Sequence, residues 1–281
     1  MLPAGDGGNI NGPSLIRVPD WVEEPLGRYY LYFAHHQGEY IRLAYADRVE
    51  GPWRIHAPGT LRLDDAPFVN WHVASPDVIV DEERRHLRMY FHGPTESEQM
   101  SFAAYSKNGL RFTPSPEPLG IYYFRVFRLD DWWYAMARGG WLYRSRDGVT
   151  AFEEGPNPFP DVDPQDKWSP SSGPRHVAVL VDGRRLWVYY TNIGDTPERI
   201  LRCTIEATGD WSDWRTAAPE EVLRPEQPWE GADLPIKTSQ VGACEREHAL
   251  RDPGLFVEDD RTYLLYSVAG ENGIAIARVE G

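Results

Sequence analysis

The chain has few cysteines and no excess of basic residues. Its 281 residues include only two cysteines, Cys203 and Cys244, which are too few for a disulfide scaffold. Lysines and arginines number 29 against 43 aspartates and glutamates, so the net charge is −14. Because this charge repels a nucleic-acid backbone, we expect no nucleic-acid partner and favour a neutral or cationic small molecule as ligand.

Long apolar runs are also missing. No stretch approaches the roughly 20 apolar residues that a membrane-spanning helix requires. The first residues lack the basic and apolar regions of a secretory signal. We therefore expect a cytoplasmic protein without membrane association, and the sequence leaves its oligomeric state open.

Turn-forming and aromatic residues are abundant. The 24 prolines and 25 glycines favour an all-β protein with many turns over one with long helices. With 41% hydrophobic and 13% aromatic residues, the chain can bury a large core.

A strand–turn–strand unit recurs along the chain. Its clearest copy is Ser75-Pro76-Asp77-Val78-Ile79-Val80, followed by a charged turn and Leu87-Arg88-Met89-Tyr90-Phe91. Proline suits the first residue of a strand, and β-branched and aromatic residues favour the strand interior. Further copies begin at Gly12-Pro13, Gly173-Pro174 and Asp252-Pro253, and a degenerate copy without proline begins at Tyr123. Repeats of several short strands are typical of a propeller.

We accordingly predict a single all-β domain, a five-bladed β-propeller over residues 1–281. The predicted blades cover residues 9–66, 72–119, 121–165, 172–224 and 249–281. The last unit ends with the strand 273–279 and shows no fourth strand. The polar connection 225–248 is long for a compact domain, and such loops are often functional, so we expect it to lie beside the channel mouth.

The innermost strands of a propeller line its channel, and residues two apart on a strand share a face. Alignment on the prolines therefore predicts that Asp77, Arg125, Arg175 and Asp252 converge at one mouth. Charges at such positions are usually paired or functional. They are either ion pairs that close the channel or a site in which Asp77 and Asp252 are the acid/base carboxylates. Arg251, beside Asp252, equally suits a structural ion pair.

Histidines and aromatic residues lie near the predicted mouth. We predict substrate-binding roles for Arg125, Arg175, Arg251, His35, His36, His72, His176 and Trp71. Adjacent residues of a strand face opposite ways, so only one of His35 and His36 should reach the channel. Trp71, Tyr123 and Trp141 could stack on a sugar face. No spacing resembles a zinc signature, so we expect no cofactor; a channel ion such as calcium remains an alternative, which the spacing does not indicate.

Several motifs resemble those of the five-bladed propeller glycosidases of glycoside hydrolase family 43 and their invertase relatives. They are Ser75-Pro76-Asp77-Val78, Arg251-Asp252-Pro253, Tyr29-Tyr30-Leu31-Tyr32-Phe33 and Glu50-Gly51-Pro52-Trp53. The resemblance covers most of the chain, and its motifs specify the fold more than the activity.

The resemblance also implies catalytic positions. It implies an aspartate base in unit one, a pKa-tuning aspartate in the Pro-Asp-Val of unit two and a glutamate acid in unit three. Asp77 matches the second of these. Gly12-Pro13-Ser14 and Phe124-Arg125-Val126 stand at the other two, so the chain resembles a divergent member.

The function predicted is that of a glycosidase-like hydrolase acting on a small carbohydrate in the central pocket. Asp77 and Asp252 lie two blades apart around the ring, as the base and acid of the family do, and an inverting reaction needs two carboxyl groups. One alternative is a non-catalytic sugar-binding propeller. Another is a lyase- or isomerase-type reaction on an anionic sugar-like substrate, using histidines and arginines, because guanidinium groups suit carboxylates and phosphates.

Overall fold

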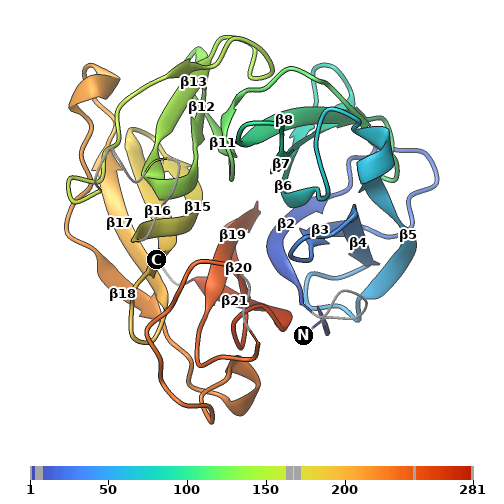
Figure 1. Ribbon diagram of the computed structural model, residues 1–281. Helices are drawn as coiled ribbons and strands as arrows, with labels where there is room; N and C mark the ends of the chain where they lie inside the picture. The colour runs from blue at the N-terminus through green and yellow to red at the C-terminus, as the bar shows by residue number, and fades with distance from the viewer. Residues whose placement is uncertain (1, 4–8, 163–166, 168–171, 243–244, 280–281) are drawn as a thin grey trace.

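Five antiparallel sheets surround one axis in the computed structural model, which describes residues 2–3, 9–162, 167, 172–242 and 245–279 (Figure 1). The all-β, five-bladed propeller predicted from the repeats is confirmed. In four of the sheets the first strand in sequence lies nearest the axis, and in the fifth, which also contains the N-terminal β1, the innermost strand is β19. These innermost strands are β2, β6, β11, β15 and β19, and they come together at the centre of the ring (Figure 1).

The strands of the first three blades follow the predicted units in order. The first blade is β2 (Asn11–Arg17), β3 (Tyr29–Ala34), β4 (Tyr40–Ala46) and β5 (Arg54–Arg62). The second is β6 (Ala74–Asp81), β7 (His86–Pro94), β8 (Gln99–Ser106) and β10 (Gly120–Ile121), with β9 (Thr113–Pro114) also paired to β8. The third is β11 (Arg125–Leu129), β12 (Trp132–Met136), β13 (Leu142–Ser145) and β14 (Glu153–Glu154).

The last two blades differ in how they obtain their outer strands. The fourth is β15 (Gly173–Asp182), β16 (Arg185–Ile193), β17 (Ile200–Glu206) and β18 (Glu220–Leu223). The fifth is β19 (Arg251–Glu258), β20 (Arg261–Ser267), β21 (Gly273–Val279) and the N-terminal β1 (Leu2–Pro3). Short 3-10 helices lie between strands: η1 (Leu63–Asp65), η2 (Arg138–Gly140), η4 (Trp211–Asp213) and η5 (Pro228–Glu230). No described helix is long and apolar enough to cross a membrane.

The ring is closed by pairing between the two ends of the chain. Leu2 of β1 pairs with Ile274 of β21, and Pro3 pairs with Gly273. The sequence interpretation that the fifth unit lacks a fourth strand was therefore wrong. The missing strand comes from the opposite end of the chain, where no local pattern could connect it to the unit.

The core lies between neighbouring blades. β3 is buried along its whole length, as expected for a strand covered on both faces. Tyr32 of the first blade packs with Phe91 and Phe102 of the second in one apolar cluster. Tyr134 of the third blade packs with Val188 of the fourth in another. These contacts fix the blades around the axis and so position the inner strands.

A β-bulge interrupts the innermost strand of four blades. In β2, β6 and β19 the extra residue falls at the repeated Xaa-Pro step, and the residue before proline has a positive φ: +60° at Gly12, +48° at Ser75 and +50° at Asp252. In β15 the bulge instead falls between Pro174 and Val177. Arg175 thus has the register position of Ser75 and Asp252, which corrects the alignment on proline that matched it to Asp77.

Candidate functional site

A small pocket opens near the starts of the inner strands β2, β6 and β11, beside the turn that follows β3. We call it the mouth cavity; its volume is about 120 Å³. It is lined by Asn11, His36, Gln37, Trp71, His72, Ala74, Ser75, His92, Gln99 and Tyr123. Three of the residues predicted to bind substrate, His36, Trp71 and His72, therefore lie together in one pocket. His35 does not line it, and its ring instead lies edge-on to Tyr40 at 5.7 Å.

Two buried histidines give the mouth cavity its chemistry. His72 and His92 are 7% and 3% exposed, and Nδ1 of each ring has no hydrogen-bond partner. Burial lowers the pKa of His72 to about 4 and lowers the pKa of His92 well below its ordinary value. Both rings are therefore neutral at neutral pH. A neutral imidazole both donates and accepts hydrogen bonds, which suits the hydroxyl groups of an uncharged ligand.

A carboxylate and an imidazole form a buried pair between blades four and five. Asp252 is fully buried; its Oδ1 pairs with Nδ1 of His176, and its Oδ2 accepts a hydrogen bond from the Ser267 hydroxyl at 2.9 Å. Burial alone would raise the pKa of Asp252, but the His176 ring and the Ser267 hydroxyl outweigh it and lower the pKa. The pair can hold a carboxylate ionised and an imidazole in a fixed orientation.

Tyr123 connects this pair to the mouth cavity. Its ring lies 3.8 Å from the ring of His176 and 4.7 Å from the ring of His92, measured between centroids. Backbone strain also gathers here, since Trp71, Ser75, Tyr123 and Asp252 all have positive φ values between +41° and +68°. Such strain in non-glycine residues persists where the surroundings enforce it and is common at functional sites.

The predicted arginines Arg175 and Arg251 lie in a buried ionic network. Nε of Arg175 and Nε of Arg251 approach the two oxygens of Glu198 at 2.8 and 2.9 Å, and Glu198 is fully buried. Arg251 also pairs with Glu271 at 3.2 Å and Glu247 at 3.3 Å. Both guanidinium groups are thus engaged by carboxylates of the protein itself.

The same network fixes part of the long connection between blades four and five. Arg251 donates to the carbonyl of Gly242 at 3.1 Å, and Arg175 donates to the carbonyl of Gln240. Within the connection, His248 contacts the carbonyl of Leu234 at 3.2 Å. The connection therefore packs against the first residues of β15 and β19.

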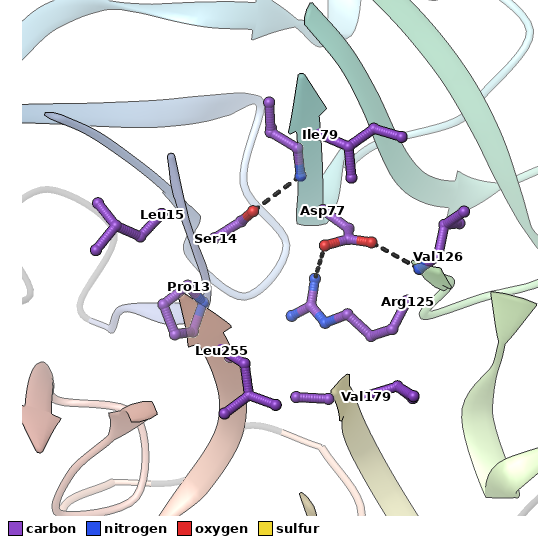
Figure 2. A pocket seen from close by; sticks show the side chains of 12 residues that line it. Pro13, Ser14, Leu15, Asp77, Ile79, Arg125, Val126, Val179 and Leu255 are labelled. Atoms are coloured by element: carbon purple, nitrogen blue, oxygen red, sulfur yellow. Dashed lines mark hydrogen bonds and ion pairs between the residues drawn. The ribbon is translucent and has the colours of Figure 1, made fainter. Parts of the chain in front are cut away.

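Asp77 and Arg125 lie in a second pocket, within the channel itself (Figure 2). We call it the channel cavity; its volume is about 140 Å³, and Pro13, Ser14, Leu15, Asp77, Val78, Ile79, Arg125, Val126, Ala178, Val179, Gly254 and Leu255 line it. Asp77 Oδ2 accepts the amide of Val126 at 2.8 Å, and Oδ1 lies 3.8 Å from Arg125 Nη1. Burial raises the pKa of Asp77, although Arg125 and the Val126 amide act to lower it.

The four inner-strand charges therefore do not share one mouth. Asp77 faces Arg125 in the channel cavity, Arg175 binds Glu198, and Asp252 pairs with His176. Sequence reasoning also missed His92. Its signal was present, because His92 follows Phe91 at the end of a second strand just as His35 and His36 follow that strand in unit one.

A wider cleft continues outward from the mouth cavity over the second blade. This outer cleft has a volume of about 680 Å³ and is lined by Asn70, Trp71, Pro94, Thr95, Glu96, Ser97, Glu98, Gln99 and Tyr122. Trp71 and Gln99 line both spaces. The Trp71 side chain is 61% exposed, so a large aromatic face is available at the junction.

Three comparisons place the chain among known proteins. An uncharacterized protein of Acanthamoeba polyphaga mimivirus is 38% identical over 297 residues, which cover 96% of this chain and 83% of the relative. No family model matches the chain. Among the described residues, no group of three or more histidines, cysteines and carboxylates is placed to hold a metal ion.

Solved structures share the fold at low sequence identity. A thermostable family-43 glycoside hydrolase has a TM-score of 0.67 at 14% identity, covering 100% of this chain and 93% of the other. CoXyl43, a GH43 β-xylosidase/α-arabinofuranosidase from a compost microbial metagenome solved with xylotriose in a calcium-free form, has a TM-score of 0.65 at 14% identity, covering 100% and 94%. A GH130-family enzyme that targets β-1,2 mannosidic linkages in Candida mannan has a TM-score of 0.68 at 13% identity, covering 100% and 90%. The chain has the fold of the five-bladed propeller glycosidases.

Proposed function

This chain belongs to the family of the uncharacterized mimivirus protein, and we propose that it is a glycosidase-like enzyme acting on a small carbohydrate in the mouth cavity. The observation that carries the proposal is the path from the buried Asp252–His176 pair through Tyr123 to a pocket lined by neutral histidines. The shared fold with glycoside hydrolases supports it, and fold alone does not specify the reaction.

In this proposal Asp252 and His176 supply the proton transfer. An ionised carboxylate that pairs with an imidazole fixes the ring's orientation and stabilises its protonated form. The imidazole can then act as general acid or base towards a bound glycoside or a water molecule. Tyr123, whose ring is tilted against that of His176, also lines the mouth cavity and so links this pair to the ligand.

A two-carboxylate reaction would instead use Asp77 as the partner of Asp252. The raised pKa of Asp77 suits a protonated general acid. However, Asp77 lines the channel cavity, where Val126 and Arg125 already contact its two oxygens, whereas Tyr123 links the Asp252–His176 pair to the mouth cavity. We therefore assign the proton transfer to Asp252 and His176 and keep Asp77 as the second candidate.

The outer cleft suggests how a ligand extends beyond the mouth cavity. A sugar ring in the cavity would direct its substituent past Trp71, whose exposed face offers a stacking surface. The cleft's charged lining residues are Glu96 and Glu98, so an uncharged glycan suits it better than an acidic one. The arginines that favoured an anionic substrate bind Glu198, Glu247, Glu271 and Asp77, so we do not extend the proposal to that substrate.

A non-catalytic sugar-binding protein is the second candidate. It is favoured by the complete burial of Asp252, which leaves His176 and Tyr123 between the carboxylate and the ligand. Such a protein would bind through the histidines and Trp71 without turning its ligand over.

The decisive experiment assays the full chain against a panel of aryl glycosides and neutral oligosaccharides. Asp252→Asn and His176→Gln should abolish most turnover of any substrate found, whereas His56→Gln, on the outer strand β5, should retain it. Asp77→Asn tests the two-carboxylate assignment in the same assay. Binding without turnover by the wild type would support the sugar-binding candidate, and undiminished turnover in both Asp252→Asn and His176→Gln would refute the assigned roles.

A further inference from the structure

The mouth cavity contains a third buried polar group besides the two histidines. Asn11, the first residue of the innermost strand β2, lines the cavity and is 6% exposed. Its side-chain oxygen, Oδ1, has no hydrogen-bond partner within the described part of the chain. A buried oxygen without a donor is costly, so it indicates a position at which a ligand or a water molecule donates a hydrogen bond.

A buried carboxylate next to Asn11 determines which end of its amide is free. Asn11 Nδ2 donates to Glu271 Oε2 at 3.0 Å, and Glu271 is 3% exposed. An ionised carboxylate only accepts hydrogen bonds, so the amide nitrogen has to face it. The rotated amide would place two acceptors against each other. Oδ1 is therefore the end of the Asn11 amide that is left for a ligand.

Glu271 is itself held in place from several sides. Its Oε1 accepts a hydrogen bond from Arg251 at 3.2 Å, and its Oε2 also accepts one from Asn9 Nδ2 at 3.3 Å. Asn9 Oδ1 in turn accepts the backbone amide of His36 at 2.6 Å, and the His36 ring lies 4.0 Å from Glu271 Oε2. Both Asn11 and His36 line the mouth cavity, so one carboxylate supports two of its lining residues.

Asn11 differs from the mouth histidines because its hydrogen-bonding role is fixed. A neutral imidazole donates or accepts at Nδ1 according to its tautomer, so His72 and His92 can adapt to either kind of ligand group. The Asn11 oxygen can only accept. The ligand group that faces it must therefore be a donor, such as a hydroxyl. A carboxylate at that position would leave Oδ1 unpaired and would also be repelled by the charge of Glu271.

We propose that Asn11 is a specificity-determining residue of the mouth cavity and that Glu271 is the positioning residue that fixes its amide. Asn11 Oδ1 accepts a hydrogen bond from one hydroxyl of a neutral sugar. The inference rests on the proposed carbohydrate function and adds to it the ligand group that is recognised at this position. A site built to bind a hydroxyl rejects an analogue that lacks it, because a buried polar group of the protein then stays unpaired.

The test is a cycle that combines a substitution in the protein with the removal of single hydroxyls from the substrate. The full chain is assayed with the aryl glycoside that it turns over fastest and with the monodeoxy derivatives of that glycoside. In the wild type, the loss of one particular hydroxyl should lower kcat/KM by about 10–100-fold. In Asn11→Ala the parent glycoside should lose a similar factor, and removal of the same hydroxyl should then change kcat/KM by less than about twofold.

The intrinsic reactivity of each deoxy derivative is the same with both proteins, so the difference between them isolates the contact with Asn11. If the chain binds a sugar without turning it over, the same cycle is measured with the Kd of that sugar and of its deoxy derivatives. Asn108→Ala is the matched control, because Asn108 is an exposed asparagine in the turn after β8. This variant should keep the wild-type dependence on every hydroxyl.

Glu271→Gln tests the positioning role. A glutamine both donates and accepts, so the Asn11 amide can rotate and present its nitrogen to the ligand instead of its oxygen. The dependence on the hydroxyl identified with the wild type should weaken, while the dependence on the other hydroxyls stays unchanged. A general loosening of the fold would weaken all of them alike, and that result would contradict the positioning role.

The outcomes separate this inference from the function on which it rests. If the wild type turns over or binds a sugar but no hydroxyl loses its effect in Asn11→Ala, the inference is wrong and the carbohydrate function stands. If the wild type neither binds nor turns over any sugar of the panel, the proposed function is refuted and the inference falls with it. If thermal denaturation shows that Asn11→Ala is unfolded, Glu271→Gln decides, and an unchanged dependence on every hydroxyl in that variant overturns the proposal.

Discussion

The mouth cavity and the channel cavity are built on the same inner strands yet differ in how their polar groups are satisfied. β6 contributes Ser75 to the mouth cavity and Asp77, two residues on, to the channel cavity. In the mouth cavity two neutral rings, His72 and His92, each have a nitrogen without a partner, whereas in the channel Asp77 and Arg125 face each other and Arg125 Nη2 alone lacks a partner among the described lining residues. Unpartnered buried groups are costly without a ligand, so the mouth is the place where a ligand is expected.

This difference teaches that charge on an inner strand is a poor guide to function by itself. The charged side chains of the inner strands contact other groups of the protein; they are Asp77, Arg125, Arg175 and Arg251. The neutral rings of His72 and His92 each have a nitrogen without a hydrogen-bond partner. This difference can be tested with substitutions in each cavity. Substitutions at the mouth cavity should change the catalytic activity, and substitutions in the channel cavity should change the stability of the fold.

The largest effect is expected at the buried pair beside the mouth. Asp252→Asn keeps the shape of the side chain but removes the negative charge that pairs with the His176 ring. Turnover should fall by about 10²–10⁴-fold, the usual contribution of general acid–base catalysis. Steady-state kinetics would measure this, and ligand affinity, measured by calorimetry, should change much less. A loss of ligand affinity without a loss of kcat would mean that Asp252 contributes to ligand binding and not to catalysis.

The second effect belongs to the channel. Asp77→Asn leaves the Arg125 guanidinium without its counter-charge, so the free energy of unfolding should fall by about 3 kcal/mol. Denaturant unfolding would measure the loss, and kcat should stay within about tenfold of the wild type. If kcat collapsed in an Asp77→Asn protein that remains folded, the channel cavity would also serve catalysis. Asp77 would then be the second catalytic carboxylate.

The third effect is a pH dependence that comes from the mouth histidines. Burial lowers the pKa of His72 to about 4, below the ordinary value near 6.5. Between these values the unfolded chain binds more protons than the folded one, so stability is complete above about pH 6.5 and falls as the pH drops towards 4. Melting temperatures of the wild type and His72→Gln across this range would measure it. Parallel pH profiles for the two proteins would exclude His72 as a contributor.

The smallest effect is expected at the junction with the outer cleft. Trp71→Ala should leave the melting temperature nearly unchanged, because the side chain is 61% exposed. If a second sugar unit stacks on this ring, affinity for a disaccharide should fall by about tenfold or less, with little change for a monosaccharide. Calorimetry with matched mono- and disaccharides would separate the two. If the affinity fell equally for both ligands, Trp71 would contact only the sugar unit in the mouth cavity.

The amino-acid sequence alone determined the repeat and the fold. Prolines at strand starts, β-branched runs and turn residues are local signals, and their recurrence indicates five units whichever residues they later contact. The sequence also identified His36, His72 and Trp71 as mouth residues, since each lies next to a predicted strand end.

Only the tertiary structure decided which groups pair. His176 meets Asp252, Arg125 meets Asp77, and β1 completes the fifth blade, and each of these contacts joins distant parts of the chain. The bulge in β15 also gives Arg175 the register position of Ser75 instead of that of Asp77, two residues further on, and the proline in the sequence does not reveal this shift. Whether a buried charge is neutralised or left free for a ligand depends on its neighbours in space, and strand periodicity specifies only the face on which it lies.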